Sequence, residues 1–162
     1  MIPAFICGPF RAPTQWGIAE NVRRAERIHL AACRLGFASV CPHANTAHFQ
    51  GECSDEFWLR MTSGMLDMVA HHGGPLICLP GAWRTSSGSR GELHRAETKH
   101  AIRFEANVIS DDPNDLLRAL AIGYSGKDSL GNDSWSPGFS NGYTISLEEW
   151  LGDEGRRERL AA

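Results

Sequence analysis

The sequence lacks the features of a protein that is exported, spans a membrane or binds polymeric nucleic acid. Its first seven residues, MIPAFIC, have no positively charged region and no long apolar run of the kind found in signal peptides. No stretch approaches the roughly 18 consecutive apolar residues of a membrane span. A net charge of −3 gives no general basic field, which argues against polymeric nucleic acid but allows a small anionic ligand. We therefore expect a cytoplasmic protein that binds a small molecule and no membrane.

Paired cysteine motifs are also absent. None of the five cysteines forms a CxxC pair, and three of them fall within strand-like apolar runs, which favours small buried thiols over disulfides. One set of residues can be written as zinc ligands, but its spacing matches no closed zinc site: Cys41, His43, His48 and Cys53. The sequence predicts neither a metal nor a cofactor.

Apolar strand-like runs and helical periods alternate along the first 123 residues. The expected strands are residues 2–7, 37–41, 76–79 and 102–109, and the expected helices are residues 15–35, 56–71, 92–101 and 114–122. This alternation predicts a single α/β domain with a doubly wound, mainly parallel sheet of about four to five strands and helices on both faces. A chain of 162 residues suits one such domain.

The composition changes after Gly123. Residues 124–143 are rich in Gly, Ser, Asn and Asp, and they suit a lid, an arm that contacts a partner, or a loose loop. The pattern from Ser146 to Glu149 is a capping box and predicts a last helix. We therefore divide the chain into an α/β domain, residues 1–123, and an appended loop and helix, residues 124–162.

Residues 76–96 organise the expected site. They form a buried strand, a small polar loop and a helix that is expected to begin with Glu92 in its first turn. In open α/β sheets, ligands bind at the carboxyl ends of the strands, and free N–H groups at a helix start favour anions. Gly8 and the loop of residues 42–55 follow strands that end at the same edge. The active site is therefore expected there.

Four motifs in order along the chain resemble a known family, among them residues 41–46 and 55–59. The pattern Trp83-x-x-Ser86-x-Gly88-x-x-x-Glu92 follows Leu-Pro-Gly, and a Gly-x-x-Arg turn occupies residues 8–11. Together they resemble the nucleoside 2-deoxyribosyltransferase-like family, which includes nucleoside 5′-monophosphate N-glycosidases. The resemblance covers about residues 2–109 and implies a flavodoxin-like or Rossmann-like fold and a homodimer or higher homo-oligomer.

Glu92 is the expected nucleophile. Breaking an N-glycosidic bond places positive charge on the sugar, so a carboxylate at the anomeric carbon stabilises that charge or forms a glycosyl ester. The alternative is that Glu92 only complements the helix dipole. In the family, a serine six residues before the nucleophile marks the nucleotide hydrolases, and Ser86 stands there. Ser86, Gly88 and the turn from Gly8 to Arg11 are therefore expected to hold a phosphate, unless they are ordinary loop residues.

The remaining candidate residues surround the sugar and base. The resemblance implies a carboxylate in the helix before the third strand, for which Asp67 is the nearest candidate; His43 or water are alternatives for protonating the leaving base. His43 and Asn45 either contact the base or ribose or bond within their loop. Phe10 and Trp83 either stack on a base or form a hydrophobic wall.

The predicted function is hydrolysis of the N-glycosidic bond of a (deoxy)nucleoside 5′-monophosphate, releasing free base and sugar phosphate. Two alternatives remain open. A nucleoside 2-deoxyribosyltransferase would use the same nucleophile for base exchange, and a nucleotide-binding or sensing protein would keep the pocket without turnover.

Overall fold

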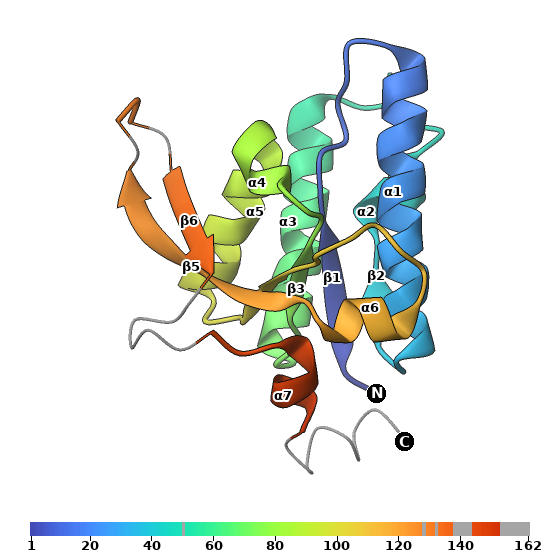
Figure 1. Cartoon of the computed structure of the whole chain (residues 1–162). Helices are drawn as coiled ribbons and strands as arrows, with labels where there is room; N and C mark the ends of the chain where they lie inside the picture. Colours follow the sequence, from blue (N-terminus) through green and yellow to red (C-terminus); the bar gives the residue numbers. More distant parts are fainter. Residues whose placement is uncertain (50, 128, 132, 138–143, 153–162) are drawn as a thin grey trace.

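The computed structural model is an α/β fold built on a six-stranded mixed sheet with the strand order β2-β1-β3-β4-β5-β6 (Figure 1). It describes residues 1–49, 51–127, 129–131, 133–137 and 144–152. Strands β2, β1, β3 and β4 are parallel, whereas β5 is antiparallel to β4 and β6 is antiparallel to β5. The mostly parallel α/β sheet that the sequence predicts is confirmed, and it continues into an antiparallel hairpin.

The elements follow the expected alternation. The strands are β1 (Pro3–Cys7), β2 (Ala38–Val40), β3 (Leu76–Cys78), β4 (Arg103–Glu105), β5 (Leu120–Lys127) and β6 (Asp133–Pro137). The helices are α1 (Gln15–Arg34), α2 (Pro42–Thr46), α3 (Asp55–His71), α4 (Ala82–Thr85), α5 (Ser87–Thr98), α6 (Pro113–Leu117) and α7 (Leu147–Leu151).

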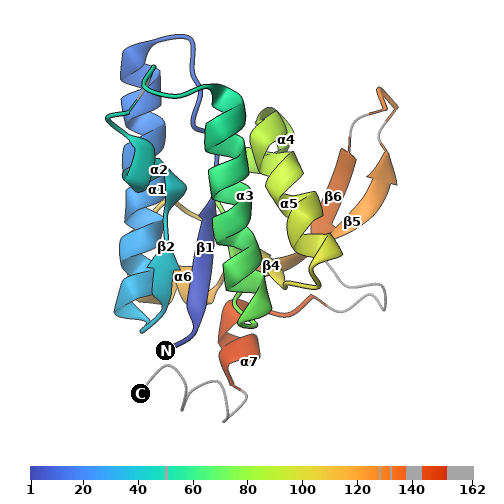
Figure 2. The same cartoon turned by 180° about the vertical axis from the view of Figure 1, so that it is seen from behind.

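Helices cover both faces of the sheet. α1 and α6 lie on one face, and α3 and α5 pack together on the other (Figures 1 and 2). β3 is wholly apolar and every residue of it is buried, as expected for a central parallel strand enclosed by two helical layers. Within the described residues, no helix has both the length and the apolar character needed to cross a bilayer.

Gly74 shows how tightly the entry to β3 is packed. A Cβ atom at this position would lie 2.1 Å from the carbonyl oxygen of Pro3 on β1. This backbone leaves no room for a side chain at this position. The glycine is therefore required for the contact between β1 and the turn before β3.

Three local predictions are wrong. α5 begins at Ser87, because the Ser86 side chain accepts a hydrogen bond from the Ser89 N–H and caps the helix there. Glu92 therefore lies in the second turn and not in the first. The predicted helix over residues 114–122 ends at Leu117, and β5 follows. Residues 42–46, expected to be irregular, form α2, whose first residue is a proline.

The C-terminal part contributes to the same core. Part of the segment expected as a lid, arm or loose loop forms the β5–β6 hairpin, while residues 138–143 lie outside the described residues. α7 has the predicted capping box between Ser146 and Glu149. Its Trp150 stacks on Phe37 and meets the edge of Phe104, so this helix closes the core beside β4.

All five cysteines are described and carry free thiols. Cys7, Cys41 and Cys78 are buried, as their positions in strand-like runs predicted, and Cys33 and Cys53 are exposed. Burial raises the pKa of the Cys41 thiol to about 11, since it is costly to charge a thiol inside the core.

Candidate active site at the carboxyl ends of β1 and β3

The strand order identifies one edge of the sheet as the place for a ligand. The chain passes from β1 outward to β2 and then returns to the other side of β1 with β3. The connections leaving β1 and β3 therefore depart to opposite faces at their carboxyl ends, which creates the crevice where doubly wound sheets bind ligands. The residue after β1 is Gly8, and a Cβ there would lie 3.1 Å from the Leu79 side chain that follows β3.

α5 directs its polar residues toward this edge. Its buried residues are Ser89, Leu93 and Ala96, with the spacing of one helix face, and that face packs on β3 and β4. Glu92 is three residues after Ser89 and therefore neighbours it on the helix surface. The same periodicity that buries Leu93 thus brings a carboxylate against the sheet.

The Glu92 carboxyl group is buried without full compensation. Its Oε2 atom has no hydrogen-bond partner among the described residues. Burial raises the pKa of Glu92 to about 7, although a hydrogen bond with the Cys7 thiol acts in the opposite direction. At neutral pH the group therefore exists in both protonation states. A carboxylate with one free oxygen suits attack on, or stabilisation of, a positively charged carbon.

His43 lies on the other side of the end of β1. Its side chain is 4% exposed, and its Nε2 atom lies 3.0 Å from the carbonyl oxygen of Gly8. A carbonyl only accepts, so Nε2 carries the proton. Burial lowers the pKa of His43, which leaves the imidazole neutral and Nδ1 with a lone pair. Nδ1 has no partner among the described residues, and it can accept a hydrogen bond but cannot supply a proton.

Three buried polar atoms without a partner thus come from two elements around one strand end. They are His43 Nδ1, Ser89 Oγ and Glu92 Oε2. His43 contacts Gly8, and Glu92 contacts the preceding residue, Cys7. Buried polar atoms are normally paired, because leaving one unpaired costs about 1–3 kcal/mol. The contacts with Gly8 and Cys7 bring these residues to the end of β1, where the three atoms are available to a polar ligand; a fourth such atom, Trp135 Nε1, lies on the hairpin.

The start of α5 adds an anion-binding group. The first N–H groups of a helix have no partner within it, and the Ser86 side chain satisfies only that of Ser89. Gly88, in the first turn, has open space around its Cα apart from Ser86 Oγ, 3.7 Å from an ideal Cβ. The N–H groups of Ser87 and Gly88 are therefore available to phosphate oxygens.

Trp83 belongs to the scaffold of this edge. It is 8% exposed, its Nε1 donates to Glu105 Oε2 at 3.1 Å, and the guanidinium of Arg84 covers its ring at 4.1 Å. Glu105 Oε1 accepts from the Gly81 N–H at 2.6 Å. The hydrophobic-wall interpretation of Trp83 fits this arrangement better than base stacking, because one ring face and the indole N–H are already occupied.

Three other candidates are Arg11, Asn45 and Phe10, and the structure places only Phe10 against another residue of the site. The exposed Arg11 side chain forms an ion pair with Asp55 at the start of α3, so the structure gives it no contact with Ser86. Asn45 is exposed on α2. The Phe10 ring lies 6.0 Å from the His43 ring, which places it beside the buried imidazole.

Asp67 is engaged elsewhere. Its two carboxylate oxygens accept from Arg95 Nε and Nη2, both at 2.7 Å, and Lys99 Nζ lies 3.7 Å away. The hydrogen bond from Arg95 is the largest of the effects that hold the pKa of Asp67 below its ordinary value. A general acid must be protonated when the reaction begins. Asp67 therefore does not fit the role of acid in this arrangement.

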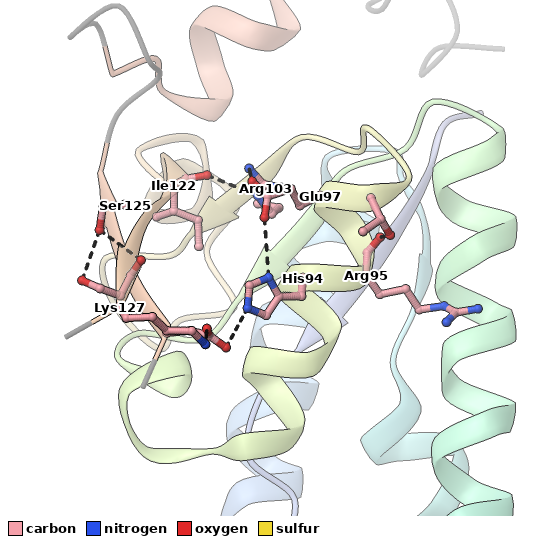
Figure 3. A network of polar contacts seen from close by, with 10 residues as sticks. His94, Arg95, Glu97, Arg103, Ile122, Ser125 and Lys127 are labelled. Atoms are coloured by element: carbon pink, nitrogen blue, oxygen red, sulfur yellow. Dashed lines mark hydrogen bonds and ion pairs between the residues drawn. The ribbon is translucent and has the colours of Figure 1, made fainter. Parts of the chain in front are cut away.

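A polar and aromatic network joins α5 to the β5–β6 hairpin. Figure 3 shows His94 on α5 directed toward the hairpin, where its Nε2 lies 2.6 Å from Asp133 Oδ2. Its ring also packs against Tyr124 and Trp135. Arg103 of β4 stacks on Trp135, 5.3 Å from the ring centre. The hairpin thus supports the helix that carries Glu92, from the side next to His94.

Sequence reasoning missed Cys7, Ser89 and Glu105 at this edge. Ser89 was detectable, because it falls on the apolar periodicity of Leu93 and Ala96. Cys7 and Glu105 were not, since their partners lie on other elements. Among the described residues, no group of three or more His, Cys, Asp and Glu side chains is arranged to hold a metal ion. Comparison of the chain with protein-family models, curated proteins and solved structures finds no match.

Proposed function

We propose that the protein hydrolyses the N-glycosidic bond of a (deoxy)nucleoside 5′-monophosphate and that Glu92 is the nucleophile. The observation that carries the proposal is the buried Glu92 carboxyl group, with a free Oε2 and a pKa of about 7, beside the carboxyl ends of β1 and β3. A buried carboxylate without a cationic partner is costly to maintain, and such groups concentrate at functional sites.

The reaction proceeds in two balanced steps. The Glu92 carboxylate attacks C1′ of the sugar, the C1′–N bond breaks, and the base leaves with the bonding electrons and takes a proton from water. Water then attacks C1′ of the glycosyl ester, releases the sugar phosphate and restores the carboxylate, and the proton that this water loses neutralises the hydroxide left by the first step. Only the ionised form of Glu92 attacks, so the rate rises with pH through about 7.

The neighbouring groups suit the rest of the substrate. The free N–H groups at the start of α5 receive the 5′-phosphate, and Ser86 holds this helix start in place. His43 Nδ1 accepts a hydrogen bond from a sugar hydroxyl or from an N–H of the base. Arg11, the other candidate for the phosphate, is paired with Asp55 in this structure.

A panel of nucleoside and deoxynucleoside monophosphates tests the proposal. Free base is measured by chromatography with the wild type, with Glu92→Gln and with Glu97→Gln, a control on the same helix outside the proposed machinery. We expect base release that is lost in Glu92→Gln by a factor of about 10³ or more and kept in Glu97→Gln. Release by neither wild type nor control, or equal release by Glu92→Gln, refutes the hydrolase.

The same panel separates the two alternatives. If a second free base is converted to its nucleoside or nucleotide in the mixture, the protein is a transferase that shields the glycosyl ester from water. If calorimetry detects tight binding and the nucleotide is recovered intact, the protein is a nucleotide-binding or sensing protein.

A further inference from the structure

Arg90 lies near the start of α5, and the proposed function gives it no role. It is partly buried, and its Nη1 atom donates to the carbonyl oxygen of Trp83 across 3.2 Å. Arg90 forms no ion pair with a carboxylate among the described residues, whereas Arg11 and Arg84 near the same edge are each paired with one. The positive charge of Arg90 is therefore not neutralised by a neighbouring side chain of the described chain.

Helix geometry directs this side chain toward the N-terminal end of α5. Arg90 is four residues after the cap Ser86, and its backbone N–H donates to the Ser86 carbonyl at 3.1 Å, so both residues lie on one helix face. Side chains on a helix lean toward its N-terminus. Because Trp83 precedes Ser86 by three residues, the bond to its carbonyl places the guanidinium beyond the first turn of α5. The free N–H groups of Ser87 and Gly88 point toward this same end.

Much of the hydrogen-bonding capacity at this helix start is unused. A guanidinium carries several N–H donors, and the Trp83 carbonyl is the one acceptor that Arg90 has among the described residues. Ser89 Oγ, in the first turn of α5 and fully buried, has no partner there either, although buried polar side chains are normally paired. A ligand with negative charge and several acceptor oxygens fits these donors, and a phosphate group has both properties.

We propose that Arg90 is a specificity-determining residue, which pairs with the 5′-phosphate and makes the site select a nucleoside monophosphate over the unphosphorylated nucleoside. The inference rests on the proposed function, since it assumes a nucleotide with its phosphate at the start of α5. Hydrogen bonds from arginine to phosphate are charge-assisted and stronger than those from neutral donors. Arg90 keeps its Nη1 bond to Trp83 and has Nη2 and Nε left for the phosphate.

Binding of 2-deoxyribose 5-phosphate tests the inference without turnover. Calorimetry measures its affinity for the wild type, Arg90→Gln, Arg90→Lys and the matched control Arg84→Gln, an arginine nearby whose charge Glu105 already neutralises. We expect Arg90→Gln to weaken binding by about 10- to 100-fold, because the phosphate loses a charged donor. Arg90→Lys should recover part of the loss, since the charge returns without the planar guanidinium, and Arg84→Gln should bind nearly as the wild type does.

Three results would overturn the inference. The first is equal affinity of Arg90→Gln and wild type, with circular dichroism showing folded protein. The second is a wild type that does not bind the sugar phosphate at millimolar concentration. The third is an equal loss in Arg90→Gln and Arg84→Gln, which would reflect only the total charge near this helix start.

Kinetics separate this role from a purely structural one. If the nucleotide panel shows base release, kcat and KM are measured for the active nucleotide and for its parent nucleoside. Arg90→Gln should raise KM for the nucleotide about 10- to 100-fold with little change in kcat, and should leave the nucleoside unaffected. An arginine that only holds α4 against α5 would alter both substrates alike. Because binding of the sugar phosphate needs no attack by Glu92, its failure is distinguishable from a failure of base release.

Discussion

Replacing Glu92 by glutamine should stabilise the protein at neutral and alkaline pH. The folded protein holds the Glu92 proton up to a pKa of about 7, whereas the unfolded chain loses it at the ordinary value of 4.5. Between these values the folded state binds more protons than the unfolded state, so the free energy of unfolding falls as pH rises. At about 1.4 kcal/mol per pH unit, the interval corresponds to about 3 kcal/mol. Glutamine keeps the shape of the side chain and carries no charge, so it avoids this loss.

Urea denaturation of both proteins from pH 4 to pH 8.5 measures the effect. The difference in unfolding free energy between Glu92→Gln and wild type should be nearly constant below pH 4.5, rise toward pH 7 and level off about 3 kcal/mol higher. Glu97→Gln is the matched control, because it removes a carboxylate of the same helix that has ionic partners, His94 and Arg103. A difference that stays flat across this range for Glu92→Gln would refute the claim that the group is buried and uncompensated.

Four further substitutions test the scaffold by urea denaturation. Gly74→Ala should destabilise the fold by about 3 kcal/mol or prevent folding, because the new Cβ meets a backbone carbonyl of β1. Gly64→Ala, in open space on α3, should instead stabilise the fold by about 0.5–1 kcal/mol. Glu105→Ala should cost about 2–3 kcal/mol, since it leaves the Trp83 indole N–H and a backbone N–H without their acceptor. Asp67→Asn should cost less than about 1 kcal/mol, because its ion pair is partly exposed, and should leave the pH midpoint of base release unchanged.

The parallel part of the fold was predictable because its signals are local. Strands β1 and β3 are short apolar runs, β4 alternates about the buried Phe104, and α1, α5 and α6, which follow these strands, have a cap that can be read within a few residues. The hairpin was not predictable in the same way. Its strands contain Gly, Ser and Asp, and they are stabilised by packing of Trp135 against His94 on α5, a contact between distant parts of the chain.

The candidate site, too, was predictable only where its signals are local in the sequence. The position of Glu92 after a strand and a polar loop could be read from the sequence, but the predicted start of α5 lies too late in the chain, because Ser86 was interpreted as a phosphate-binding or loop residue and not as the cap. The burial of Glu92 could not be predicted, because it depends on β1 and β3 being neighbours, which brings Cys7 under the helix. The expectation that Asp67 supplies a proton failed to include Arg95, although Arg95 is on the helix that packs against α3.

Two glutamates near this edge differ in how their carboxylates are satisfied, and the difference supports the role that we propose for Glu92. Glu105 has both oxygens occupied, one by the Gly81 N–H and the other by the Trp83 indole, and Arg84 lies 3.5 Å away. Glu92 has no cationic partner and one buried oxygen with no partner among the described residues. Glu105 contacts α4 and Glu92 is on α5, and both helices follow β3. The fold can therefore supply hydrogen-bond donors to both oxygens of a glutamate here, and it does so only for Glu105. Because an uncompensated carboxylate lowers stability, the arrangement at Glu92 is best explained by a ligand that completes it.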